Sequence, residues 1–109
     1  MSETAKVLVI GAAAVDTKGV ASEPFLAGVS TPGRIRNSVG GVGRNIAENL
    51  SRLGIETTLI TAIGDDEAGR RILRQAEDSG LDMSQTLIAR GCNTGAYICL
   101  LYTSPSPRD

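Results

Sequence analysis

Gly40-Gly41-Val42-Gly43-Arg44-Asn45-Ile46-Ala47 is the stretch whose residue types and spacing most restrict the fold of this chain. Its three glycines within four positions allow positive φ angles and let another group approach the bare main chain. Asn45 follows at the expected start of a helix, where its amide can donate to and accept from a polyhydroxylated ligand. The stretch therefore predicts a ligand-cradling turn that leads into a helix.

The residues after this turn have the periodicity of a helix and then of a strand. Ile46, Leu50 and Leu53 fall on one helical face, and Gly54 follows at the position that commonly ends a helix. Residues 57–63 are rich in β-branched side chains and are bounded by glycines, which predicts a strand.

A second helix is expected over residues 67–79, where apolar side chains recur at core spacing. Asp65-Asp66 precedes it as the N-terminal cap, and Gly80 marks its end. A spacing of four residues predicts an ion pair between Glu67 and Arg71.

Shorter strands are expected elsewhere. The apolar run 6–10 predicts a buried parallel strand, and residues 86–89 and 94–98 predict two more strands joined by a turn. Residues 20–39 mix proline and glycine with short apolar stretches, which indicates small strands and turns.

The glycines belong to a longer pattern that resembles the N-terminal signature of the ribokinase/PfkB carbohydrate kinases. The matching positions are Gly40, Gly41, Gly43, Asn45, Ala47, Gly54 and Gly64. The resemblance extends over about residues 7–97, and the string Thr31-Pro32-Gly33-Arg34-Ile35 before GGVGRN is most similar to pseudouridine kinase-like members of the family.

This resemblance implies the N-terminal part of a ribokinase-like three-layer α/β/α fold with a small β lid at about residues 20–39. A fold of that kind needs roughly two to three times the 109 residues of this chain. Residues 1–98 are therefore expected to be the N-terminal portion of a PfkB-type kinase domain.

The resemblance also implies an acceptor-binding site, formed by Asp16, Gly40, Gly41, Gly43, Asn45 and Thr94. Asp16 is expected in the loop beyond the strand 6–10, where ligands bind in open α/β sheets; the alternative is a plain loop acid or a helix cap. In the family a Thr-Gly step often leads into a lid strand here, which makes Thr94 and Tyr97 candidates to contact the substrate; the alternative is that Thr94 simply suits a β position. Further candidates for the inner face of the lid are Phe25, Ile35 and Arg36.

The chemistry expected of this chain is binding. Phosphoryl transfer needs a base and a magnesium-assisted clamp on the transferred phosphate. In the family, the base is an aspartate of a Gly-x-Gly-Asp turn in the C-terminal half, and no such turn follows Gly64. The resemblance thus implies ATP and Mg²⁺ for the full-length protein only, with no catalytic residue in this chain and no turnover by it.

Two alternatives remain. An NAD-binding oxidoreductase fragment is disfavoured because residues 41–46 lack the third glycine of Gly-x-Gly-x-x-Gly. A non-catalytic sugar- or nucleotide-binding module is the other, and it predicts cooperative unfolding of the isolated chain. A truncated sheet would instead expose an unpaired edge.

Composition agrees with a soluble α/β domain, for which a cytoplasmic location is expected, while a small sugar or nucleoside as partner is implied by the family resemblance. Hydrophobic residues make up 41%, the net charge is -1, and no apolar run approaches the ~20 residues of a membrane span. No basic patch indicates nucleic acid, and because residues 1–4 carry no positively charged segment, no signal peptide is expected. Cys92 and Cys99 form no metal motif without histidines and are expected to be small apolar residues. The family resemblance adds a homodimer through the lid.

The last residues, 99–109, follow neither periodicity and contain two prolines within the final five positions. They resemble the translated frame of a sequencing adapter. We therefore expect a non-native, disordered tail after Ile98, with a genuine flexible tail as the alternative.

Overall fold

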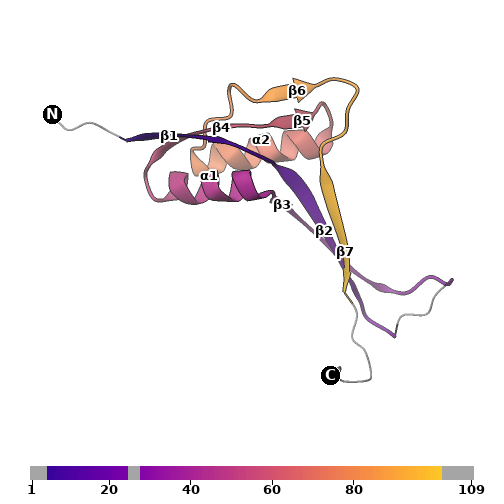
Figure 1. Cartoon of the computed structure of the whole chain (residues 1–109). Helices are drawn as coiled ribbons and strands as arrows, with labels where there is room; N and C mark the ends of the chain where they lie inside the picture. Colours follow the sequence, from indigo (N-terminus) through magenta and orange to yellow (C-terminus); the bar gives the residue numbers. More distant parts are fainter. Residues whose placement is uncertain (1–4, 25–27, 102–109) are drawn as a thin grey trace.

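A computed structural model of the chain describes residues 5–24 and 28–101 (Figure 1). The elements in chain order are β1 (Lys6–Ile10), β2 (Ala14–Ala21), β3 (Gly33–Gly40), α1 (Val42–Arg52), β4 (Glu56–Ile60), β5 (Ala62–Gly64), α2 (Glu67–Ser79), β6 (Leu87–Ala89) and β7 (Ala96–Leu101). Figure 1 shows an α/β body from which three strands, β2, β3 and β7, project as an arm. None of the described helices is long and apolar enough to cross a membrane.

The body joins two small parallel sheets to two helices. Strand β1 pairs with β4, and β5 pairs with β6. Helix α1 packs on β1 and β4, and α2 packs on α1 and β5 (Figure 1). Leu59 of β4 and Ile72 of α2 are the largest apolar side chains with almost no exposure, so the core lies between strands and helices.

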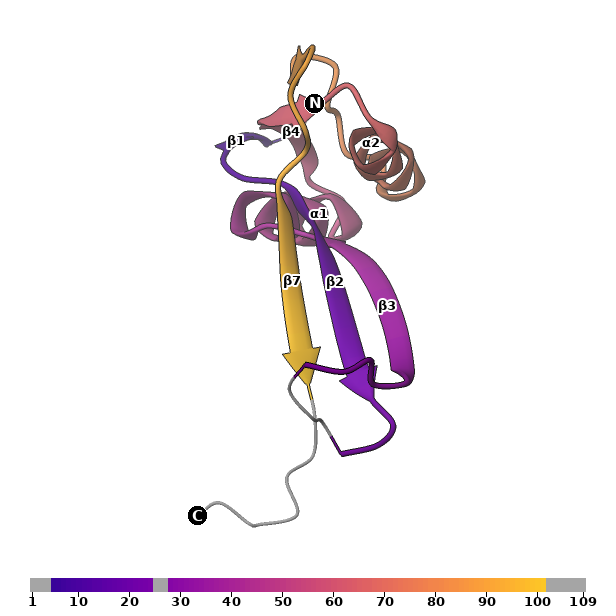
Figure 2. The same ribbon diagram turned by 90° about the vertical axis from the view of Figure 1, so that its right-hand side faces the viewer.

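The arm is a separate sheet of order β3-β2-β7, with β2 antiparallel to β3 and parallel to β7. Figure 2 shows these strands side by side on one side of α1, with β2 and β7 running away from the helix. Strand β2 starts only four positions after Ile10 ends β1, so the arm leaves the body directly. The described part consequently measures 62 × 36 × 21 Å, long for its size.

Two expectations about strands are corrected. Asp16 lies within β2, paired with Ser38 and Tyr97, and not in a loop. The expected strand 57–63 is divided at Thr61, whose N–H donates to the Thr86 hydroxyl at 3.3 Å. Because a side chain takes the hydrogen bond at that point, the backbone changes its pairing partner from β1 to β6.

The helix ends follow the expected glycines. Gly54 has φ 90° just after α1, and Gly80 has φ 77° at the end of α2. Asp66 is confirmed as the N-cap of α2, because its carboxylate accepts from the Gly69 N–H at 2.8 Å; Asp65 is not the cap.

The predicted ion pair between Glu67 and Arg71 is wrong. Glu67 instead binds Arg74 at 2.9 Å and Arg70 at 3.5 Å. The Arg71 guanidinium turns away from its own helix and donates to the Asn37 carbonyl of β3 at 3.1 Å. A bond to the arm has therefore replaced the local pair.

One face of β1 is uncovered in the described part of the chain, although the apolar run predicts burial. Leu8 is 57% exposed and Ile10 is 74% exposed, while Val7 and Val9 are turned toward the helices and half-buried. Parallel strands are usually covered on both faces. Here helices cover only one of them.

At the C-terminal end, β7 continues through Leu101, three residues past the boundary expected near Ile98. Cys99 belongs to this strand, where it is paired with Lys18 of β2. Residues 102–109 and the lid candidate Phe25 lie outside the described residues.

Candidate functional site

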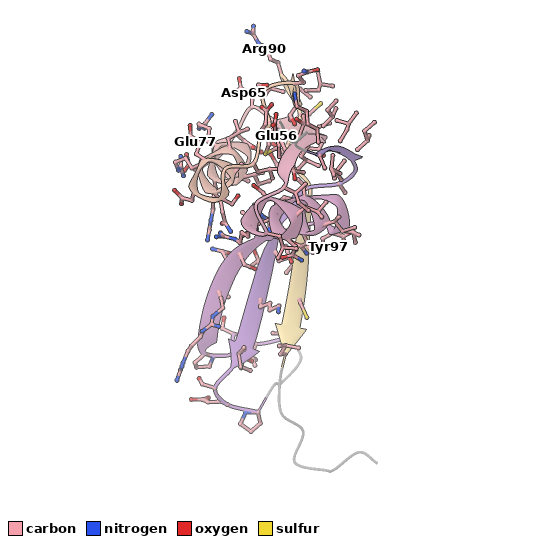
Figure 3. The ribbon with its side chains drawn as sticks, turned by 90° about the vertical axis from the view of Figure 1, so that its left-hand side faces the viewer. Glu56, Asp65, Glu77, Arg90 and Tyr97 are labelled. Atoms are coloured by element: carbon pink, nitrogen blue, oxygen red, sulfur yellow. The ribbon has the colours of Figure 1, made fainter. Side chains whose placement is uncertain are left out.

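A hollow of about 350 Å³ lies where the arm meets the first turn of α1. Residues of the β1–β2 loop, β2, the start of α1 and β7 line it: Ala12, Asp16, Thr17, Lys18, Gly41, Val42, Asn45, Tyr97 and Cys99. Figure 3 shows Tyr97 at the junction of α1 and β7. Three of the predicted site residues, Asp16, Gly41 and Asn45, thus meet at one place, together with Tyr97.

Gly40 makes room for the Asp16 carboxylate. A Cβ placed on Gly40 would lie 2.5 Å from Asp16 Oδ2 and 3.0 Å from its Cγ. The carboxylate therefore lies against the Gly40 Cα, from the neighbouring strand. Gly40 itself is buried and does not line the hollow.

Gly41 and Gly43 let α1 approach the β1–β2 loop. Gly41 has φ 100°, which favours glycine, and a Cβ there would lie 2.5 Å from the Ala12 carbonyl oxygen. A Cβ on Gly43 would lie 2.8 Å from the Gly11 Cα. The Arg44 N–H completes this contact by donating to the Ala12 carbonyl at 3.0 Å. The glycine turn therefore works first as a backbone-to-backbone joint.

Asn45 is exposed at the hollow, but its amide oxygen is already engaged. Arg44 Nη2 donates to Asn45 Oδ1 at 2.7 Å, and Nη1 of the same guanidinium donates to Glu48. Arg44 is only 6% exposed. Sequence reasoning missed Arg44; the spacing of four between it and Glu48 was the available signal.

Glu48 is the charge partner of two arginines. Burial by itself would raise the pKa of Glu48, but the hydrogen bonds from Arg52 and Arg44 outweigh that effect and lower the pKa. Arg52 Nε lies 2.7 Å from a carboxylate oxygen of Glu48. The spacing of four residues on one helix predicts such a pair. Glu48 is therefore ionised at neutral pH.

Thr94 lies away from the hollow and is used inside the fold. It is 7% exposed, and its hydroxyl donates to Asp66 at 2.6 Å while accepting from the Gly64 N–H at 2.9 Å. Its own N–H donates to the second Asp66 oxygen at 2.8 Å. These bonds lower the pKa of Asp66, the Thr94 hydroxyl first, then the N–H groups of Thr94 and Gly69. Thr94 ties the start of the β7 segment to α2.

The remaining candidates lie elsewhere. Ile35 and Arg36 line a different hollow, of about 640 Å³, toward the tip of the arm. Within residues 5–24 and 28–101 no group of three histidine, cysteine or acidic side chains could hold a metal ion. Cys92 and Cys99 are free and exposed, not packed as small apolar residues.

The hollow therefore offers an acceptor, a donor and an aromatic ring. The Asp16 carboxylate accepts hydrogen bonds, and the amide NH₂ of Asn45 donates. Tyr97, 70% exposed, adds a flat apolar surface at the edge. Such a set suits a ligand with neighbouring hydroxyl groups.

Comparison with known proteins gives consistent matches. A model described as pfkB family carbohydrate kinase matches residues 4–108. The pseudouridine kinase of Escherichia coli (strain K12) is 42% identical over 101 residues, covering 93% of this chain and 32% of that protein. A carbohydrate kinase from Agrobacterium tumefaciens superposes with a TM-score of 0.80 at 32% identity, covering 91% of this chain and 32% of the other.

A further solved structure, aminoimidazole riboside kinase from Salmonella enterica, was determined with aminoimidazole riboside and an ATP analogue. It superposes with a TM-score of 0.68 at 29% identity, covering 85% of this chain and 28% of its own. The chain thus spans about a third of the length of these relatives. The ribokinase-like α/β fold expected from the glycine signature is confirmed.

Proposed function

Because the chain belongs to the pfkB family of carbohydrate kinases, we propose that the full-length protein phosphorylates a hydroxyl group of a sugar or nucleoside with ATP. This chain carries the part of the site that binds the acceptor. The observation that supports this best is the meeting of Asp16 and Asn45 in one hollow, although they lie on different elements.

The chemistry of the hollow fits a hydroxylated acceptor. A hydroxyl group can donate to the Asp16 carboxylate and accept from the Asn45 NH₂ at the same time. A volume of about 350 Å³ is at the lower end of the range for small-molecule sites. Tyr97 at the edge offers a stacking surface, which favours a nucleoside over a bare sugar.

Within this class we propose pseudouridine as the acceptor. Its support is the 42% identity to a pseudouridine kinase over 93% of this chain. Tyr97 and Lys18 are the largest side chains that line the hollow, so selection among nucleosides is expected to depend on these two foremost.

The nucleotide side of the reaction belongs to the proposal for the full-length protein. No cluster of acidic side chains fitted to Mg²⁺ is found among the described residues. In this proposal the catalytic aspartate, ATP and Mg²⁺ belong to the rest of the protein, so residues 1–109 alone should show no turnover. A cytoplasmic location and a homodimer of the full-length protein through the lid, at about residues 20–39, complete this proposal.

The test is ADP release by the full-length protein with a panel of pseudouridine, uridine, inosine and ribose. We expect activity with at least one member and the lowest KM for pseudouridine. Asp16→Asn should lower kcat/KM by about 10- to 100-fold, the effect of losing a charged hydrogen-bond partner. Asp78→Asn, an exposed change at the far end of α2, is the matched control.

Each outcome decides something. No ADP release with any member of the panel would refute the kinase function. Activity that is strongest with another member would refute only the choice of pseudouridine. Equal loss in the Asp16 and Asp78 variants would show that Asp16 has no special role.

A further inference from the structure

A buried arginine stands directly behind the asparagine of the candidate site. Arg44 donates through Nη2 to Asn45 Oδ1 at 2.7 Å, and through the same nitrogen to the Val39 carbonyl at 3.4 Å. We propose that Arg44 is a positioning residue that holds the Asn45 amide with its NH₂ turned toward the acceptor. The inference rests on the proposed kinase function and deepens it.

The direction of the amide follows from the chemistry of the two groups. A guanidinium has five N–H donors and no acceptor, whereas a side-chain amide has a donating NH₂ group and an accepting oxygen. Only Oδ1 of Asn45 can therefore face Arg44, and the NH₂ is left free to donate. Since the Asp16 carboxylate in the same hollow only accepts, the Asp16 and Asn45 side chains together present one acceptor and one donor.

The opposite orientation would impair this arrangement. An Asn45 amide rotated by half a turn would present a second acceptor to the ligand beside the Asp16 carboxylate. A hydroxyl group has one proton and could satisfy only one of these acceptors. The rotated amide would also bring its NH₂ against the Arg44 donors. Arg44 thus decides which hydrogen-bonding pattern the acceptor meets.

The guanidinium is itself held in place. The Arg44 N–H donates to the Ala12 carbonyl at 3.0 Å, and Nη1 binds the ionised Glu48, which is 14% exposed. Arg44 Nε is the buried side-chain atom without a partner among residues 5–24 and 28–101. An unpaired buried N–H costs stability. Burial of the Arg44 side chain therefore carries a cost in stability, which is consistent with a role in orienting Asn45 and not in stabilising the fold.

A double-mutant cycle in the full-length protein tests the inference, with pseudouridine as the probe. Arg44→Gln replaces a pure donor by an amide that permits either orientation of Asn45. We expect about a tenfold higher KM for pseudouridine, the effect of one charge-assisted hydrogen bond, with a smaller change in kcat and none in the KM for ATP. Arg52→Gln also removes a partner of Glu48 but does not touch Asn45, so its KM should equal that of the wild type.

The cycle separates orientation from general stability. If Arg44 acts through Asn45, adding Arg44→Gln to Asn45→Ala should raise the KM no further. If Arg44→Gln raises the KM by the same factor in both backgrounds, Arg44 acts independently and the proposal is wrong. Arg44→Lys, which has donors only, should keep a KM near that of the wild type. A folded Arg44→Lys protein whose KM for pseudouridine is raised about tenfold would overturn the proposal, including the case in which Arg44→Gln does not fold.

Binding measurements distinguish this inference from the kinase proposal. Titration calorimetry with pseudouridine gives the same cycle in dissociation constants. Wild-type protein that binds pseudouridine but phosphorylates no member of the panel would refute the kinase function and leave the cycle in dissociation constants decisive for Arg44. Wild-type protein that neither binds nor phosphorylates any member of the panel would refute both.

Discussion

Alanine at Gly40 and at Gly43 should have opposite effects, although both positions belong to one glycine turn. At Gly40 the new Cβ would lie 2.5 Å from Asp16 Oδ2, about 0.9 Å inside the 3.4 Å at which ordinary contact begins. The obstacle is the end of a rotatable side chain, so the carboxylate can move aside. At Gly43 the obstacles are the backbone atoms Gly11 Cα and C, at 2.8 and 2.9 Å, which cannot rotate away.

The magnitudes follow from these obstacles. Gly40→Ala should change the free energy of unfolding by less than about 1 kcal/mol. The same variant should lower kcat/KM roughly 100-fold, because the new methyl group displaces the Asp16 carboxylate by about 1 Å. Gly43→Ala gains about 1 kcal/mol of helix propensity but forces an overpacked joint costing about 1–3 kcal/mol. The net expectation is a loss of up to about 2 kcal/mol, with KM little changed in the protein that remains folded.

The assay is urea unfolding of the full-length protein combined with kcat and KM for the acceptor. Gly54→Ala is a poor control because Gly54 has φ 90°. Gly95→Ala is a better one: its Cβ would meet nothing closer than 3.9 Å, and its φ lies outside the left-handed region. The reasoning is refuted if Gly40→Ala unfolds as easily as Gly43→Ala while its KM stays at the wild-type value.

Three further outcomes are expected. The hydrogen bonds that lower the pKa of Asp66 contribute their full stability above the ordinary value of 3.8, and this contribution is lost as the pH falls through the lower folded-state pKa. Asp66→Asn should therefore flatten the pH dependence of the urea midpoint below about pH 5. Thr94→Val should lower the melting temperature and leave the acceptor KM unchanged, because Thr94 binds Asp66 and does not line the hollow; a raised KM at unchanged stability would contradict this. Residues 1–109 alone should aggregate through the uncovered face of β1. Ile10→Lys places a charge on this face and should reduce the light scattering of the fragment. A cooperative melt of the unaltered fragment would instead favour a self-contained binding module.

Features that depend on near neighbours in the chain were predictable. Helix α2 follows its apolar spacing, and the Asp66 cap is a contact with a residue three positions ahead. The glycine signature also indicated the family, because it combines positive φ with close backbone approach at fixed spacing. The interpretation of that turn changed, however: Gly40 and Gly43 shape the site from beneath and do not line it.

The sequence by itself thus determined the helices, the glycine turn and the kinase family, since each of these depends on local geometry. Only the tertiary structure decided what Asp16, Arg44 and Thr94 do. Asp16 became a strand residue by pairing with β3 and β7, and Thr94 met an aspartate 28 positions earlier. Arg44 was buried when α1 docked on the loop after β1. The physical reason is that side-chain burial and hydrogen-bond partners across the fold depend on how distant elements pack, which local spacing does not encode.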